Sequence, residues 1–200
     1  MSLVIFTCVV GLIIAPEQVS FFNATFSLIA VALGAGAAGT LNMWYEADLD
    51  ALMKRTCLRP IPTGKVTKQQ ALIFGLLTSL ISIIALYFFS NLISAVLLTI
   101  TILFYVVIYT IWLKQKTPQN IVIGGAAGAF PPIIGWTIAT GNITLEPILL
   151  FLIIFFWTPS HFWALSLYKK EDYKNAKIPM LPVTAGIKTT KINIFIYSLI

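Results

Sequence analysis

Residues Gln69 to Leu113 read QQALIFGLLTSLISIIALYFFSNLISAVLLTITILFYVVIYTIWL and contain no charged side chain. A helix that crosses a hydrocarbon core of roughly 30 Å needs about 20 mainly apolar residues. The stretch is long enough for two such helices, with a polar break at Ser90 and Asn91. Lipid offers no hydrogen-bond partners to backbone N–H and C=O groups, so both crossings must be helices, which pair these groups internally.

The rest of the chain has the same apolar character. Hydrophobic residues make up 58% of the 200 residues and charged residues 10%, whereas a soluble domain is roughly 45–50% apolar and about 25% charged. These proportions exclude a soluble fold. We therefore expect one all-α domain over residues 1–200, a polytopic transmembrane helical bundle. Its expected spans are Ser2–Ala15, Phe22–Trp44, Ala71–Ser90, Leu92–Leu113, Ile121–Ala139 and Ile148–Tyr168.

Both ends of the chain predict an incomplete bundle. The first expected span is shorter than a crossing requires, and it lacks the positively charged start of a signal peptide. A further helix is expected to begin near Ile192 and is still apolar at Ile200. We interpret the chain as a fragment with six spans and the start of a seventh.

The positive charges predict the orientation of these spans. All 13 Lys and Arg lie in residues 54–68, 114–116 and 169–191, which are alternate loops on one side of the membrane. The only charged side chains in the opposite loops are those of Glu17 and Glu146. Such asymmetry places the basic loops in the cytoplasm. It also accounts for the net charge of +6, so we expect no nucleic-acid partner.

The first polar loop contains an oxygen-rich pattern in NMWYEADLDALMKRTCLRP, residues 42–60. Asn42, Glu46 and Asp50 are spaced four apart, so on a helix they share one face. Asp48 lies off that face unless the helix loosens. Mg²⁺ favours oxygen ligands, takes one or two carboxylates, and completes its shell with water and substrate phosphates. We predict that these four residues hold Mg²⁺, with Glu46 and Asp50 also catalytic.

Basic side chains follow the acids within one or two turns. Lys54, Arg55 and Arg59 are positioned to contact phosphate oxygens that a metal leaves exposed. The alternative is an interfacial loop whose charges are solvated and pair with one another. The four-residue spacing and the Arg59-Pro60 step favour a diphosphate site.

A second acidic segment, YKKEDYKNAKIPMLP at residues 168–182, follows the sixth expected span on the same side. Glu171 and Asp172 are predicted metal ligands, Asp172 is also a predicted catalytic residue, and Tyr168 is a predicted substrate contact. Two acidic loops on one side could bracket one ligand through metal ions. Lysines beside a membrane also bind anionic headgroups, which is the alternative for this segment.

The pattern Asn42-x3-Glu46-x3-Asp50, followed by basic residues and Arg59-Pro60, resembles the first aspartate-rich motif of the UbiA superfamily of intramembrane prenyltransferases. Residues 117–136 (TPQNIVIGGAAGAFPPIIGW), 157–165 (WTPSHFWAL) and 178–183 (IPMLPV) are similar to the haem O synthase branch of that superfamily. The resemblance covers essentially the whole chain, and members of the family are longer at both ends, with about nine helices.

The resemblance implies a reaction and its partners. Farnesyl diphosphate, bound through Mg²⁺ to the two acidic loops, ionises, and the 2-vinyl group of haem b attacks the allylic cation to give haem O. It also implies residence in lipid, in the inner membrane of a bacterium, and association with haem A synthase. The sequence departs from the superfamily in having Glu46 where an Asp is frequent, and Ala176 where the second motif usually repeats an acid.

Further side chains are candidates for the same chemistry. Tyr109 and Lys114, at the exit of the fourth span, are predicted diphosphate contacts. Trp44, Tyr45, Tyr109 and Trp163 are either cation–π partners of the allylic cation or interfacial anchors. His161, the single histidine, is a predicted substrate residue, either as a haem iron ligand or through a helix-to-helix hydrogen bond.

The glycine-rich fifth span has a structural interpretation. Gly124, Gly125 and Gly128 are expected to allow close helix packing rather than to bind phosphate. Pro131-Pro132 is expected to kink the same span.

Two other functions fit parts of the sequence. A prenyltransferase that acts on an aromatic quinone precursor needs only the first loop, but residues 117–136 and 157–165 argue against it. A transporter or non-catalytic haem-handling protein predicts polar residues near the bilayer midplane, whereas these acids gather at one interface.

Overall fold

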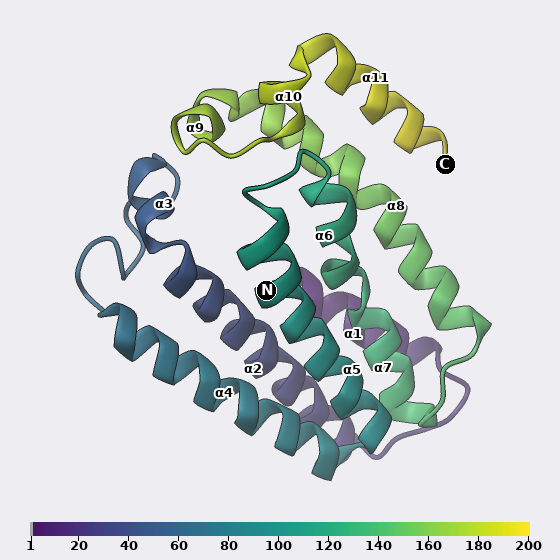
Figure 1. The fold of residues 1–200 in the computed structure, drawn as a ribbon. Helices are drawn as coiled ribbons and strands as arrows, with labels where there is room; N and C mark the ends of the chain where they lie inside the picture. The colour runs from purple at the N-terminus through teal and green to yellow at the C-terminus, as the bar shows by residue number, and fades with distance from the viewer. Residues whose placement is uncertain (1) are drawn as a thin grey trace.

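The computed structural model describes residues 2–200, and this part of the chain is helical throughout, without a strand (Figure 1). Its long helices pack side by side, and short ones lie in the connections. The elements are α1 (Ser2–Ile14), α2 (Phe21–Tyr45), α3 (Ala47–Leu52), α4 (Lys68–Phe89), α5 (Leu92–Leu103), the π-helix η1 (Phe104–Leu113), α6 (Asn120–Ala129), α7 (Pro131–Thr140), α8 (Leu145–Tyr168), α9 (Lys170–Asn175), α10 (Leu181–Thr184) and α11 (Gly186–Leu199).

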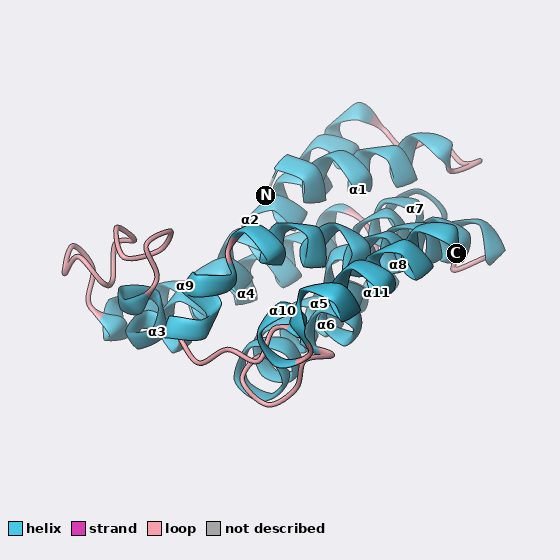
Figure 2. Cartoon of the chain, turned by 90° about the horizontal axis from the view of Figure 1, so that it is seen from above, coloured by secondary structure: helices cyan, strands magenta, loops and turns pink. Residues whose placement is uncertain are grey.

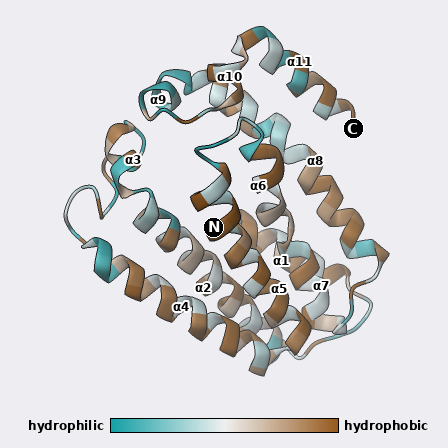
Figure 3. Cartoon of the chain, in the orientation of Figure 1, coloured by the Kyte–Doolittle hydropathy of each residue, from teal (hydrophilic) through white to brown (hydrophobic). Residues whose placement is uncertain are grey.

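Five segments of residues 2–200 are long and apolar enough to cross a membrane: Phe21–Tyr45, Lys68–Phe89, Leu92–Leu113, Asn120–Thr140 and Leu145–Tyr168. They match the second to sixth expected spans. The segment expected as the first span, α1, is apolar but shorter than a crossing. The long helices are hydrophobic over most of their length, and hydrophilic residues collect on the short helices and loops (Figure 3). Many large apolar side chains of the long helices are exposed. The all-α transmembrane bundle is confirmed, and the chain is a multi-pass membrane protein.

Glycines allow the closest helix contacts. α2 packs along α4, where a Cβ on Gly75 would lie 2.7 Å from the Leu41 side chain. α1 packs on α7, where a Cβ on Gly135 would collide with the backbone carbonyl of Cys8. Small residues let helix backbones approach in this way where lipid supplies no hydrophobic drive to associate.

The fifth span bends where its prolines stand. α6 ends at Ala129, and α7 begins at Pro131 with Phe130 between them, because a proline ring removes a backbone donor and clashes with the preceding turn. The predicted kink is confirmed. In the fourth span the helix loosens to π geometry from Phe104, and there the Thr110 hydroxyl donates to the carbonyl of Tyr105 (2.9 Å).

The seventh helix begins earlier than the apolar pattern predicted. α11 starts at Gly186 rather than near Ile192, and Gly186 has a left-handed backbone with φ 82°. The first turns of α11 carry exposed Lys188 and Lys191. Hydropathy located only the apolar part of this helix, whereas the glycine marks its beginning.

The polar connections lie together at one end of the bundle. Figure 1 shows α3, α9 and α10 at the upper end of the bundle, and Figure 2, seen from above, shows α3 and α9 side by side. At the other end, the Asn91 side chain between α4 and α5 donates to the carbonyl of Thr137 in α7 (2.6 Å). The loops that carry the Lys and Arg side chains therefore share one end of the molecule.

Candidate active site

The acidic stripe predicted from the first loop is formed and buried. Asn42 lies in the last turn of α2, Glu46 at the junction with α3, and Asp50 within α3. The amide of Glu46 donates to the carbonyl of Asn42 (2.9 Å), and that of Asp50 to the carbonyl of Glu46 (2.8 Å), so helical spacing continues through the junction. The exposed fractions of these residues are 6%, 1% and 0%. Asp48 points away, with its side chain 87% exposed.

Each carboxylate of this loop has a basic partner. Lys114 Nζ lies 2.5 Å from Glu46 Oε2, and Arg59 Nη1 lies 2.7 Å from Asp50 Oδ2. Lys68 pairs with Asp48 at 2.8 Å. Of these three acids only Asp48 is solvated, and an exposed pair of this kind contributes about 0–1 kcal/mol. Asp50 pairs with Arg59 of the same loop, so the alternative of mutually paired charges also fits it in part. The carboxylates of Glu46 and Asp50 are removed from water. Burying a charge is costly, and a close ion pair with good geometry is needed to offset that cost.

One oxygen of each buried carboxylate has no partner. Glu46 Oε1 and Asp50 Oδ1 are buried and accept no hydrogen bond. A buried carboxylate oxygen without a donor is costly, and a hard cation would satisfy it. Within residues 2–200 no three His, Cys, Asp or Glu side chains converge on one point. The stripe therefore fits Mg²⁺, which needs only one or two carboxylates when water and phosphate complete its shell.

The two polar loops meet across a cavity of about 380 Å³. Its lining residues are Lys54 and Arg55 from the first loop and Tyr168, Lys169, Glu171 and Asp172 from the second. An apolar cluster holds the loops in place: Met53 packs with Tyr173, Ile178 and Met180. The structure thus brings the basic residues of one loop to the acids of the other, although the two loops are far apart in the sequence.

The exit of the fourth span contacts the acidic stripe. The Asn42 side chain donates to the Thr110 hydroxyl (3.1 Å). Lys114, already paired with Glu46, lies 5.9 Å from the centre of the Tyr109 ring, and that ring stacks on Tyr105 with centroids 5.5 Å apart. Two stacked phenol rings and an ammonium therefore stand beside the buried acids.

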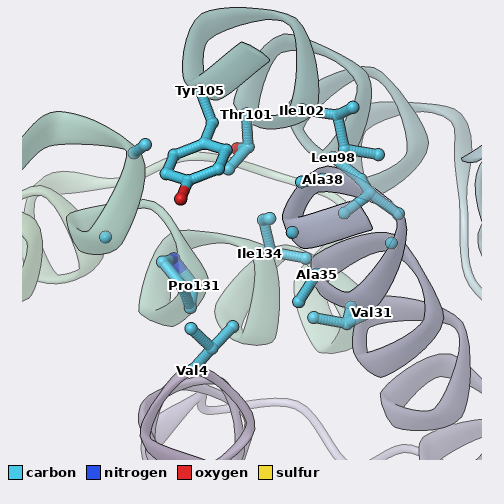
Figure 4. Close-up of a pocket in the computed structure, with 14 residues that line it drawn as sticks. Val4, Val31, Ala35, Ala38, Leu98, Thr101, Ile102, Tyr105, Pro131 and Ile134 are labelled. Carbon is cyan, nitrogen blue, oxygen red and sulfur yellow. The ribbon is translucent and has the colours of Figure 1, made fainter. Parts of the chain in front are cut away.

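An apolar cavity of about 270 Å³ lies inside the bundle, along the part of α2 that leads to Asn42 (Figure 4). Tyr105 and Thr101 supply its hydroxyl groups, and Val4 of α1 closes one side. The complete lining is Val4, Val31, Gly34, Ala35, Ala38, Gly39, Leu98, Thr101, Ile102, Tyr105, Ala127, Gly128, Pro131 and Ile134.

Some predicted residues lie outside these cavities. His161 is exposed on α8, where its ring stacks on Trp157 with centroids 4.3 Å apart; it makes no hydrogen bond to any described residue. Trp163 is buried and meets Tyr197 of α11 edge-on. Trp44 and Tyr45 contact each other at the end of α2.

The expectation for the three glycines holds for two of them. A Cβ on Gly124 would collide with the Tyr109 ring, and one on Gly125 would lie 3.0 Å from Thr158, so both allow close packing. The expectation is wrong for Gly128, where a Cβ would meet nothing within 4 Å.

Sequence reasoning missed Tyr105 and Asn120. Tyr105 lines the apolar cavity, and its spacing of four from Tyr109 was the available signal. Asn120 is fully buried, and its amide donates to the carbonyls of Thr117 (2.6 Å) and Lys114 (3.4 Å). It braces the loop that carries Lys114, a role that depends on tertiary contacts.

Residues 4–200 match the family model described as the UbiA prenyltransferase family. The chain belongs to this family. It is 72% identical over 200 residues to the protoheme IX farnesyltransferase of Pelagibacter ubique and 57% identical to that of Paracoccus denitrificans. Each alignment covers all of this chain and 66% of the relative, so the chain spans slightly less than two thirds of their length.

Solved structures share the fold of this family member. A UbiA homolog from Archaeoglobus fulgidus, bound to DMAPP and Mg²⁺, aligns with a TM-score of 0.79 at 17% identity, over 99% of this chain and 71% of that one. The apo structure of a UbiA homolog from Aeropyrum pernix aligns with a TM-score of 0.81 at 18% identity, over 98% and 73%.

Proposed function

We propose that this chain carries the catalytic loops of a farnesyltransferase that converts haem b into haem O, with farnesyl diphosphate as donor. The relatives that are 55–72% identical to it bear the name protoheme IX farnesyltransferase. The observation that carries the proposal is the acidic stripe itself. Two buried carboxylates, Glu46 and Asp50, each keep one unpartnered oxygen in the loop whose Lys54 and Arg55 line the cavity between the two polar loops.

The proposed metal ligands are Asn42, Glu46 and Asp50 from the first loop and Glu171 and Asp172 from the second. Asp48, predicted with them, is exposed and paired with Lys68, so it is left out of the set. Mg²⁺ held there neutralises the diphosphate and makes it a better leaving group. The UbiA homolog of the same fold that is bound to DMAPP and Mg²⁺ supports the choice of this ion.

The basic residues bind and orient the diphosphate. Lys54 and Arg55 line the cavity between the loops, where their charges face the position in which negative charge grows as the C–O bond breaks. Arg59 and Lys114 are held at Asp50 and Glu46, within reach of the same group. Tyr168 lines the same cavity and can donate its hydroxyl hydrogen to a phosphate oxygen.

The apolar cavity protects the carbocation. Once diphosphate leaves, the farnesyl C1 is an allylic cation that bulk water would quench, and the apolar walls exclude that water. Tyr105 lines this cavity and stacks on Tyr109, so the aromatic pair offers a π face that attracts a cation through Tyr105. The terminal vinyl carbon of haem b then bonds to C1, water adds its hydroxyl to the inner vinyl carbon, and one proton is released.

The proposal extends to the setting of the reaction. The loops that carry the Lys and Arg side chains face the cytoplasm by the positive-inside rule, in the inner membrane of a bacterium. The farnesylated product is more apolar than haem b, so we propose that it passes within the membrane to an associated haem A synthase. His161 remains a proposed haem contact, with its ring on the exposed face of α8.

The experiment is mass analysis of haem from membranes that contain this chain, supplied with haem b, farnesyl diphosphate and Mg²⁺. We expect the mass of haem O, and its loss in Asp50→Asn. If this chain forms none, the assay is repeated on a chimera extended at both ends with the corresponding segments of the Pelagibacter relative. A chimera that folds and binds farnesyl diphosphate but farnesylates a quinone-precursor aromatic, or no acceptor, would refute haem O formation.

A further inference from the structure

Two glycines in the wall of the apolar cavity have no packing partner. Gly39 lies in α2 and Gly128 in α6, and both line the cavity. A Cβ built on either residue meets no atom of the described part of the chain within 4 Å. Neither residue has the positive φ that would require glycine. Packing against residues 2–200 and backbone conformation therefore do not explain why these positions lack a side chain.

Other glycines of the bundle behave differently. A Cβ on Gly34 would lie 2.9 Å from Leu98, one on Gly75 would lie 2.7 Å from Leu41, and one on Gly124 would collide with Tyr109. Those three are glycine because a neighbouring side chain occupies the space. Since glycine weakens a helix relative to alanine, Gly39 and Gly128 lower helix stability without improving packing.

The position of Gly39 indicates what the free space is for. Gly39 precedes Asn42 by three residues, so it lies on the same side of α2 and about 4.5 Å further along the helix axis. A donor whose diphosphate is held at the acidic stripe would place its C1 close to this level. The acceptor carbon must come within about 3–3.5 Å of C1 before a bond forms. The cavity must therefore hold parts of two molecules near Gly39.

Three branched side chains lie at the end of the cavity furthest from the polar loops. Val31, Leu98 and Ile134 line the cavity at the positions on α2, α5 and α7 furthest from the polar loops, and each is nearly inaccessible. At that end the cavity needs to hold only the flexible prenyl chain of the donor. Gly128 is exposed, so this wall of the cavity can be reached from outside the helices described. A broad acceptor dissolved in the membrane could approach there.

We propose that Gly39 and Gly128 are acceptor-specificity residues, which keep the cavity wide for a flat, vinyl-bearing aromatic macrocycle beside the prenyl donor. This inference rests on the proposed farnesyl transfer to haem b. A methyl group on either glycine would project into the space of the acceptor's reacting edge, while the diphosphate-binding residues stay in place. The two glycines thus lower the stability of their helices but leave room for the acceptor.

The test uses Gly39→Ala and Gly128→Ala in the form of the enzyme that makes haem O. Three quantities are measured: the midpoint of thermal unfolding, the Kd of farnesyl diphosphate with Mg²⁺, and kcat/KM for haem b at saturating donor. We expect an unchanged midpoint or a rise of roughly 1–4 °C, because alanine favours the helix. The Kd of farnesyl diphosphate should stay within about twofold of the wild-type value. The kcat/KM for haem b should fall roughly tenfold or more, because the added methyl group overpacks the space that the acceptor needs.

The control is Gly75→Ala, whose Cβ meets Leu41 rather than a cavity. Its midpoint should fall, while kcat/KM per folded enzyme stays near that of the wild type. Folded glycine variants that keep kcat/KM for haem b within twofold would overturn the inference. So would a donor Kd that rises in step with the loss of transfer, or a failure to fold. These outcomes require an active wild type, so they are distinct from a failure of haem O formation itself.

Discussion

Replacing Lys114 by methionine tests whether the Glu46 ion pair belongs to the buried site. Lys114 Nζ lies 2.5 Å from Glu46 Oε2, with side-chain exposures of 15% and 1%. Methionine keeps most of the apolar stem and removes the charge. Glu46 would then be a buried carboxylate with both oxygens unpartnered, because Oε1 already accepts no hydrogen bond.

The cost of this change is set by burial. Removing one partner of a buried ion pair destabilises a protein by about 3–5 kcal/mol. For a chain of this size each kcal/mol lowers the unfolding midpoint by roughly 2–4 °C. We expect Lys114→Met to unfold about 10 °C below the wild type. The double variant Glu46→Gln/Lys114→Met should recover most of that loss, since no unpaired charge remains.

The assay is thermal unfolding of the purified protein in detergent, with and without Mg²⁺. A cation that binds the freed carboxylate stabilises the folded state by mass action. Mg²⁺ should therefore raise the midpoint of Lys114→Met more than that of the double variant. A single variant within about 2 °C of the wild type would refute the argument, because the pair would then be worth no more than an exposed one.

Three further changes have distinct expected outcomes. Gly135→Ala forces a Cβ into the Cys8 backbone, so α1 should detach from α7, and limited proteolysis should cut α1 faster than in the wild type. Asp48→Asn removes an exposed pair with Lys68, so the unfolding free energy should change by less than about 1 kcal/mol, and a larger loss would contradict its placement. His161→Ala should alter the absorption spectrum of bound haem if the imidazole ligates the iron, and an unchanged axial-ligand band would exclude that role.

The acidic stripe and the spans were predictable because each follows from a local period. Spacing of four residues places Asn42, Glu46 and Asp50 on one helical face, and uncharged runs long enough to cross lipid identify the helices. The same spacing placed Asp48 off this face, where the structure has it exposed and paired with Lys68, although it was also predicted as a metal ligand. The proline pair at 131–132 likewise identified the break between α6 and α7.

Contacts between distant segments were not predictable from these periods. The pairing of Glu46 with Lys114, the bracing by Asn120 and the stacking of Tyr105 on Tyr109 depend on how the fourth span packs beside α2 and α6. The glycines show the same limit. Composition predicted close packing for Gly124, Gly125 and Gly128 alike, but only the arrangement of helices separates the packed pair from Gly128 in the cavity wall.

The central claim is that the two polar loops jointly bind a prenyl diphosphate through Mg²⁺. The most direct measurement is equilibrium binding of farnesyl diphosphate, with and without Mg²⁺, to the wild type, Asp50→Asn and Asp172→Asn. We predict Mg²⁺-dependent binding by the wild type and a loss of roughly tenfold or more in each variant, with Asp48→Asn as the matched control that binds like the wild type. Binding that survives both substitutions, or that does not depend on Mg²⁺, would contradict the account.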